Sequence, residues 1–97
     1  MSVYSIAEIK ERVIPIAENY GVKRVVLFGS YARGEATENS DVDFRIDEGK
    51  IHDLFALSDF RLDLEDILCK KVDVVTSVGL RDKFLTSIKD DEVVLYG

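Results

Sequence analysis

The chain has 97 residues, of which 46% are hydrophobic and 33% charged, and its formal net charge is −6. These values indicate one folded domain over residues 1–97 and exclude a disordered chain. No apolar run approaches the ~18 residues needed to cross a bilayer, so we expect a cytoplasmic protein without membrane contact. The acidic balance argues against direct binding of nucleic acid through a broad electrostatic surface.

The first predicted element is a helix over about residues 5–19. Ser5 and Glu8 have the spacing of a capping box, and apolar residues then recur at helical intervals. Pro15 falls inside this segment, where it removes a hydrogen bond and is expected to kink the helix or tighten it locally. Gly21 is expected to cap the C-terminus.

An apolar run over residues 25–28 predicts a strand, which ends abruptly at Gly29 and Ser30. Gly29 lets the backbone approach a ligand closely, and Ser30 offers an N–H and a hydroxyl to phosphate oxygens. A short helix from Ser30 to about Glu35 would point its N-terminus at the same place, and Arg33 could add a charge-assisted contact. The alternatives are an ordinary turn at Gly29 and a solvated surface charge at Arg33.

A polar loop then leads to a second strand, predicted from Asp41 to about Asp47. Asp41 and Asp43 are two residues apart, so their side chains leave one face of the strand and can converge on one cation. Arg45 has the same parity, and on that face it could contact a triphosphate or neutralise the carboxylates. Asp41 could instead cap the loop.

Helical spacing of apolar residues returns at Ile51 and continues to Cys69, with Ser58 or Asp59 as a candidate second start. We interpret His52, which has no partner in the sequence, as a surface or capping residue. Cys69 is interpreted as a structural residue at the helix end. As the lone cysteine, it excludes an internal disulfide and agrees with a reducing compartment.

A third predicted strand is interrupted by Asp73. An unpaired Asp is rare in a buried strand, because an ionised group away from water needs a cation or a donor. Asp73 therefore either joins Asp41 and Asp43 around divalent cations or pairs with Arg45 or Lys71. Oxygen-only ligands of this kind suit Mg²⁺ or Mn²⁺ better than zinc.

The remaining predicted elements are a helix over about residues 80–89 and an edge strand or docked tail over residues 93–96. Together with the string GSYARGEATENSDVD over residues 29–43, the pattern resembles the DNA polymerase β-like nucleotidyltransferases. In detail it is similar to the minimal nucleotidyltransferases (MNT), which are usually paired with a HEPN-type partner. The resemblance covers most of the chain and implies an α/β (α+β) fold, with a small mixed β-sheet flanked by helices.

The same resemblance implies an enzyme that transfers AMP from ATP to a tyrosine of a HEPN toxin. The nucleotidyltransferase would then be the antitoxin of a toxin–antitoxin pair. Two Mg²⁺ ions are implied, one at the triphosphate and one at the attacking hydroxyl. The site residues so implied are Asp41, Asp43 and Asp73 for catalysis and metal binding, and Gly29, Ser30 and Arg33 for the nucleotide.

Two positions depart from the commoner family pattern. Arg45 stands where an aliphatic residue is usual, and Cys69 replaces a frequent Gly, a change expected to alter only the turn. Related enzymes carry a second domain for the acceptor, and none is expected here, so another protein is expected to bring the acceptor. A non-catalytic binding antitoxin and a nucleotidyltransferase for a small hydroxylated acceptor remain alternatives, and homo- and hetero-oligomers are both open.

Overall fold

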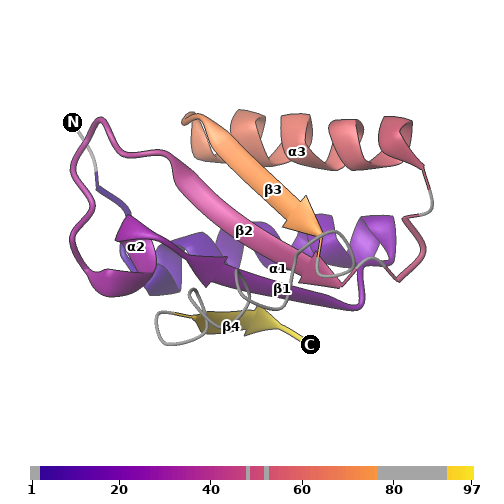
Figure 1. Cartoon of the computed structure of the whole chain (residues 1–97), viewed down its shortest axis with the longest axis horizontal. Coiled ribbons are helices and arrows are strands. Elements are labelled where there is room, and N and C mark those ends of the chain that lie inside the picture. Colours follow the sequence, from indigo (N-terminus) through magenta and orange to yellow (C-terminus); the bar gives the residue numbers. More distant parts are fainter. Residues whose placement is uncertain (1–2, 48, 52, 77–91) are drawn as a thin grey trace.

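The computed structural model describes residues 3–47, 49–51, 53–76 and 92–97. The elements are α1 (Ile6–Tyr20), β1 (Arg24–Phe28), α2 (Ser30–Arg33), β2 (Val42–Asp47), α3 (Leu54–Leu68), β3 (Val72–Thr76) and β4 (Val93–Tyr96). The described strands form one sheet in the order β3-β2-β1-β4, in which β2 and β3 are parallel and the other pairs antiparallel. Helices α1 and α3 lie against one face of this sheet (Figure 1). The predicted α/β class with a small mixed sheet is confirmed.

The ends of α1 follow local sequence signals. Ser5 Oγ accepts a hydrogen bond from the Glu8 N–H at 3.1 Å, and the Glu8 carboxylate accepts one from the Ser5 N–H at 2.8 Å. The helix runs through Pro15 and ends at Gly21, whose φ of 69° is left-handed. The predicted capping box and glycine cap are confirmed, whereas the kink at Pro15 stays a prediction.

The core lies between the sheet and the two long helices. Alternate residues of β2 are buried there, and the residues between them are only partly buried. Each fully buried Val, Phe or Ile side chain contributes roughly 1.5–3 kcal/mol to folding. The helices supply matching apolar rows, all 0% exposed, from Ile9, Val13 and Ala17 of α1 and Phe60, Leu64 and Leu68 of α3.

Helix α3 is continuous, which corrects two expectations about its start. It begins at Leu54, because the Asp53 carboxylate accepts a hydrogen bond from the Ala56 N–H at 2.7 Å and so caps the first turn. Ile51 is buried but precedes the helix, and no second start occurs at Asp59. The side chain that caps the helix, rather than the first apolar residue, sets its boundary.

The C-terminal part of the chain is described over residues 53–76 and 92–97. α3 ends at Leu68 and is capped by Cys69, an exposed residue with a left-handed φ of 53°. Residues 93–96 form the predicted edge strand, β4, which pairs with β1. The predicted helix at residues 80–89 and His52 lie outside the described residues. Among the helices that the structure describes, none has the length and apolar character to span a membrane.

Candidate active site

Strand β1 leads directly into the turn at Gly29 and Ser30. Gly29 has φ 78° and ψ −154°, a conformation that side chains rarely adopt, and a Cβ there would overlap the Asp43 carboxylate. Glycine is therefore required for two reasons, its backbone angles and its close neighbour. α2 begins at Ser30 and stops at Gly34, where φ is 73°. The sequence predicted that the backbone at this turn approaches a ligand, which stays a prediction. In the structure, the backbone lies against the Asp43 carboxylate.

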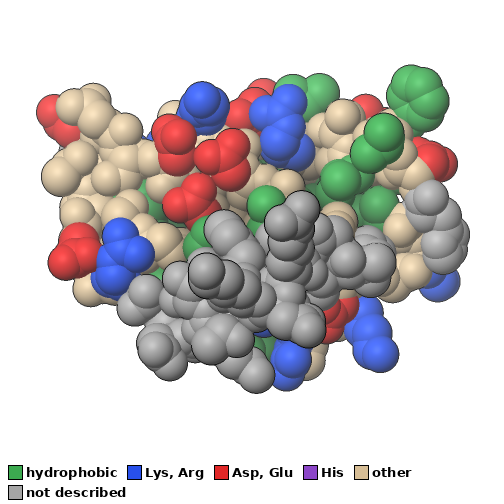
Figure 2. All heavy atoms as spheres, viewed as in Figure 1, with side chains coloured by type: hydrophobic (Ala, Val, Ile, Leu, Met, Phe, Trp, Pro, Cys, Tyr) green, Lys and Arg blue, Asp and Glu red, His purple; other side chains and the backbone are tan. Residues whose placement is uncertain are grey.

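Strand pairing places Asp43 beside Asp73. Phe28 of β1 and Asp73 of β3 are both register partners of Asp43, and residues paired in this way share one face of the sheet. That face is opposite to α1 and α3. Asp41 immediately precedes β2 and has the parity of Asp43. In Figure 2, acidic side chains gather over the starts of β2 and β3.

The crowding of negative charge raises the pKa of Asp43 to about 6. Burial of the carboxyl group is the largest cause, followed by repulsion from Asp73 and then from Asp41. A hydrogen bond between the Asp43 and Asp73 side chains adds to the rise, whereas the positive charge of Arg33 lowers the pKa. The three predicted carboxylates therefore interact electrostatically with one another. Asp41 and Asp73 raise the pKa of Asp43, and Arg33 lowers it.

The chemistry of this site fits a hard divalent cation. All its donors are oxygens, and carboxyl groups that repel one another at close range are stabilised by a proton or by a cation between them. The side chains are not arranged as a finished coordination sphere: in the described part of the chain, no group of three His, Cys, Asp or Glu residues could hold a metal ion as it stands. The metal role of Asp41, Asp43 and Asp73 stays a prediction.

The loop before Asp41 is fixed by its own hydrogen bonds. The Thr37 N–H donates to Ser40 Oγ at 2.8 Å, and the Ser40 N–H donates to the Thr37 carbonyl at 3.0 Å. Lys70 Nζ donates to the Glu38 carbonyl at 2.8 Å and so ties the loop to the turn after α3. Ser40 thus performs the capping role that sequence analysis offered as an alternative for Asp41.

Sequence analysis missed Glu65 of α3, which holds the start of β3. Its Oε2 accepts a hydrogen bond from the Val72 N–H at 3.0 Å and lies 3.0 Å from Arg61 Nη1. β3 is an edge strand, where alternate N–H groups lack a partner in the sheet. Glu65 satisfies one of them directly before Asp73. The four-residue spacing of Arg61 and Glu65 is a signal of an ion pair, but it does not reveal the backbone group.

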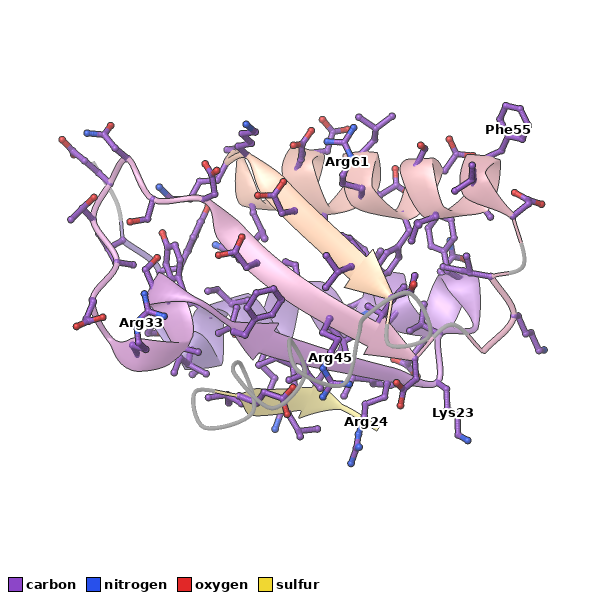
Figure 3. All side chains as sticks on the ribbon, viewed as in Figure 1. Lys23, Arg24, Arg33, Arg45, Phe55 and Arg61 are labelled. Atoms are coloured by element: carbon purple, nitrogen blue, oxygen red, sulfur yellow. The ribbon has the colours of Figure 1, made fainter. Side chains whose placement is uncertain are left out.

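Arg45 lies on the carboxylate face, as its parity predicts, and contacts acidic residues near β4. Its Nε and Nη2 lie 2.7 and 2.5 Å from Glu92 Oε2, and its Nη1 lies 3.8 Å from Asp47 Oδ1. The Arg45 and Glu92 side chains are only 11% and 12% exposed. In Figure 3, Arg45 lies toward β4, whereas Arg33 lies on α2 at the other end of the sheet. Contact between Arg45 and a triphosphate stays a prediction.

Comparison with known proteins now assigns the family. The family model described as Polymerase beta, Nucleotidyltransferase matches residues 11–97. The chain belongs to this family. A candidate protein adenylyltransferase of Methanocaldococcus jannaschii is 41% identical to this nucleotidyltransferase over 90 residues, which cover 89% of the chain and 97% of that protein. The protein adenylyltransferase MntA of Thermococcus cleftensis is 39% identical over 66 residues, which cover 68% of the chain and 67% of MntA.

Solved structures show the same fold. A candidate minimal nucleotidyltransferase superposes with a TM-score of 0.76 at 32% identity, over 87% of this chain and 86% of that one. A toxin–antitoxin structure with AMP-PNP gives 0.79 at 22% identity, over 91% and 73%. A tri-AMPylated Shewanella oneidensis HEPN toxin in complex with MNT antitoxin gives 0.72 at 19%, over 92% and 70%. The last two are similar in fold alone, and the predicted resemblance to minimal nucleotidyltransferases is confirmed.

Proposed function

We propose that this nucleotidyltransferase moves AMP from ATP, with Mg²⁺, to a tyrosine hydroxyl of a HEPN-type toxin, and so acts as the antitoxin of a pair. The observation that carries the proposal is the register pairing of Asp43 with Asp73 beside the Gly29 turn. Its relatives named as protein adenylyltransferases support the transfer of AMP to a protein. The HEPN toxin bound to a structural neighbour supports the choice of partner.

Asp41, Asp43 and Asp73 would hold the Mg²⁺ ions. When bound, these ions neutralise charge on the phosphates and lower the pKa of the attacking hydroxyl. Asp43 is partly buried between the other two carboxylates and the Gly29 turn, so its position is the most constrained of the three. Asp73 is exposed on the edge strand, and it is therefore the carboxylate that an incoming protein can reach most easily.

The backbone at Gly29, together with the N–H and hydroxyl of Ser30, would bind the β and γ phosphates. Arg33 would add a charge-assisted contact from α2. This arrangement would direct the α phosphate toward the carboxylates, because the turn lies directly against Asp43. The same turn would therefore orient the triphosphate, and it limits the space around the Asp43 carboxylate.

In the transfer itself, the tyrosine oxygen forms a bond to the α phosphorus of ATP. The bond between that phosphorus and the oxygen that bridges to the β phosphate breaks, and pyrophosphate leaves with the bonding electrons. The tyrosine proton passes to Asp73 or to water beside it. The product is a tyrosine that carries AMP through a phosphodiester bond, and the reaction needs no oxidant or reductant.

The direct test uses ATP labelled at the α phosphate and a HEPN-type protein from the same genome. We expect label on that protein in the presence of Mg²⁺, and none with EDTA or with the Asp41→Asn/Asp43→Asn variant. The matched control is Glu11→Gln/Glu18→Gln, which removes two exposed carboxylates from α1 and should transfer AMP normally. Tight binding without label, equal for wild type and the aspartate variant, would contradict enzymatic transfer and support a binding antitoxin.

A further inference from the structure

The outward side of α3 carries large apolar and acidic side chains in one line. Successive members are four, three and four residues apart, which places them along the side of the helix that faces away from the core. We call this line the α3 stripe, and it consists of Phe55, Asp59, Leu62 and Asp66. Phe55 is 85% exposed and Leu62 50%, and Leu54 beside them is 78% exposed.

The exposure of the α3 stripe is more than the scattered apolar surface of an ordinary soluble protein. Single exposed apolar residues need no explanation, but three large ones on one side of a single helix concentrate apolar surface that water solvates poorly. Figure 3 shows Phe55 projecting away from the body of the molecule at the start of α3. In Figure 2, apolar side chains gather at the same end of the molecule. An aromatic side chain held out in this way is suited to fill a pocket on another protein.

The charges around the stripe indicate the chemistry of that protein. Asp59 and Asp66 are exposed within the stripe, and Asp53 is exposed at the start of the helix. Against them, the only cation of α3 is Arg61, which already pairs with Glu65. A second copy of this chain would bring the same acidic residues face to face, and each copy has a net charge of −6. A partner with Lys or Arg around an apolar pocket fits the stripe better.

The C-terminal end of the stripe, at Asp66, lies toward the proposed reaction site, whereas Phe55 lies at the far end of α3 (Figure 3). α3 packs beside β3, the edge strand that carries Asp73, as Figure 1 shows. The helix spans roughly 22 Å at 1.5 Å per residue, and its C-terminal end leads through a short turn into β3. A protein bound along the stripe would therefore lie along the sheet edge where the exposed Asp73 carboxylate is accessible.

We propose that the α3 stripe docks the protein acceptor of this nucleotidyltransferase, through an apolar pocket bordered by basic side chains on that acceptor. The proposal rests on the proposed function, because it identifies how the acceptor is held. Phe55 and Leu62 supply the apolar contact, and Asp59 and Asp66 select a basic partner and speed its association. Docking at this edge holds the acceptor protein beside the strand that carries Asp73.

The test measures the equilibrium Kd between this chain and a HEPN-type protein from the same genome by biolayer interferometry. Phe55→Ser is expected to raise the Kd at least about tenfold, as removal of a central aromatic contact does. Val94→Thr is the matched control, because Val94 is 47% exposed on β4 at the opposite edge of the sheet, and its Kd should match that of the wild type. Circular dichroism melts confirm that both variants fold.

A second variant examines the charge of the stripe. Asp59→Asn/Asp66→Asn should slow association and weaken its dependence on salt, with a smaller change in dissociation. An unchanged Kd for Phe55→Ser and for Phe55→Ser/Leu62→Ser would overturn the proposal. Sedimentation that shows a wild-type dimer abolished by Phe55→Ser would also overturn it, since the stripe would then bind a second copy of the chain.

Docking and AMP transfer can fail separately, and the labelled ATP assay distinguishes them. A Kd that depends on Phe55, with no label transferred by the wild type, supports the docking surface and contradicts the proposed function. Label transferred equally by wild type and Phe55→Ser, at acceptor concentrations below the Kd, contradicts the docking surface and leaves the proposed function intact. If both hold, Phe55→Ser should raise the KM for the acceptor protein with little change in kcat.

Discussion

The two faces of β2 differ in what they contact and in what they contribute. The residues that face the helices are 0% exposed, and the residues between them remain partly exposed beside other charged groups. The buried set is Val42, Phe44 and Ile46, and the other set is Asp43, Arg45 and Asp47. Packing against two helices fixes the strand, so carboxylates that repel one another can be held together on the opposite face at a cost in stability. Substitutions on each face should therefore separate fold from function.

The largest expected effect is on the carboxylate face. Asp43→Asn should lower AMP transfer at least about 100-fold, because the most constrained of the three carboxylates is lost while the size of the side chain is kept. Its melting temperature without metal should be no lower than that of the wild type, since repulsion from Asp73 and Asp41 is relieved. A calorimetric melt beside the transfer assay measures both, and a variant that transfers AMP normally would contradict the proposed site.

Substitutions on the face of β2 that packs against the helices should instead lower stability. Phe44→Ala should lower the free energy of unfolding by about 3–5 kcal/mol, since a fully buried side chain is replaced by a cavity. Urea unfolding followed by circular dichroism measures this loss. The adjacent Asp43→Asn is the control, and equal destabilisation by the two substitutions would contradict the separation of the faces.

The pH dependence of stability should identify the repulsion on the carboxylate face. The folded-state pKa of Asp43 is raised to about 6 from an ordinary value of 3.8, so the folded protein binds this proton more tightly than the unfolded chain does. The contribution to stability is fully present below the ordinary value and is lost as the pH rises through the folded-state pKa. In EDTA, the melting temperature of Asp43→Asn minus that of the wild type should therefore increase between pH 5 and pH 7.5, by roughly a few degrees.

Addition of Mg²⁺ at the higher pH should narrow that difference, because the cation would replace the missing proton on the wild-type carboxylates. Glu11→Gln serves as the control, since this exposed carboxylate lies on α1. A difference between Asp43→Asn and the wild type that stays constant across this pH range would contradict the raised pKa.

A smaller loss of stability is expected where α3 contacts β3 through Glu65. Glu65→Ala removes the acceptor of the Val72 N–H and should cost about 1 kcal/mol, because water at the sheet edge can replace the lost hydrogen bond in part. Arg61→Met removes only the ion pair and should cost roughly 0.2–0.5 kcal/mol. Urea unfolding of the two variants measures the difference, and equal losses would mean that the bond to the backbone contributes nothing.

The smallest expected effect is a gain in stability at the turn between α3 and β3. Cys69 is the only non-glycine residue with a positive φ in the described part of the chain. Cys69→Gly should raise the free energy of unfolding by about 0.5–1 kcal/mol, because glycine adopts this conformation without strain. Cys69→Ala is the control that removes the thiol and keeps the strain. If both raise stability equally, the thiol rather than the backbone is responsible.

Much of the fold and part of the candidate site could be predicted from the sequence. The capping box of α1, the glycine caps and the alternation of β2 depend on residues within a few positions of one another, so a local pattern contains them. The Gly29 turn and the spacing of Asp41 and Asp43 are local in the same sense. The apolar pattern predicted less well which side chains are buried, since Leu54 and Phe55 belong to it and are exposed.

Within the described residues, the sequence by itself determined the helices and strands apart from the start of α3. It also determined the turn and the family resemblance, because these follow from short-range geometry and from a string of fifteen residues in a fixed order, GSYARGEATENSDVD. Only the tertiary structure decided which distant groups meet. The parallel pairing of β2 and β3 places Asp73 beside Asp43, and the edge position of β3 makes Asp73 exposed rather than buried. Contacts between residues far apart in the chain depend on strand order and helix packing, which no local pattern contains.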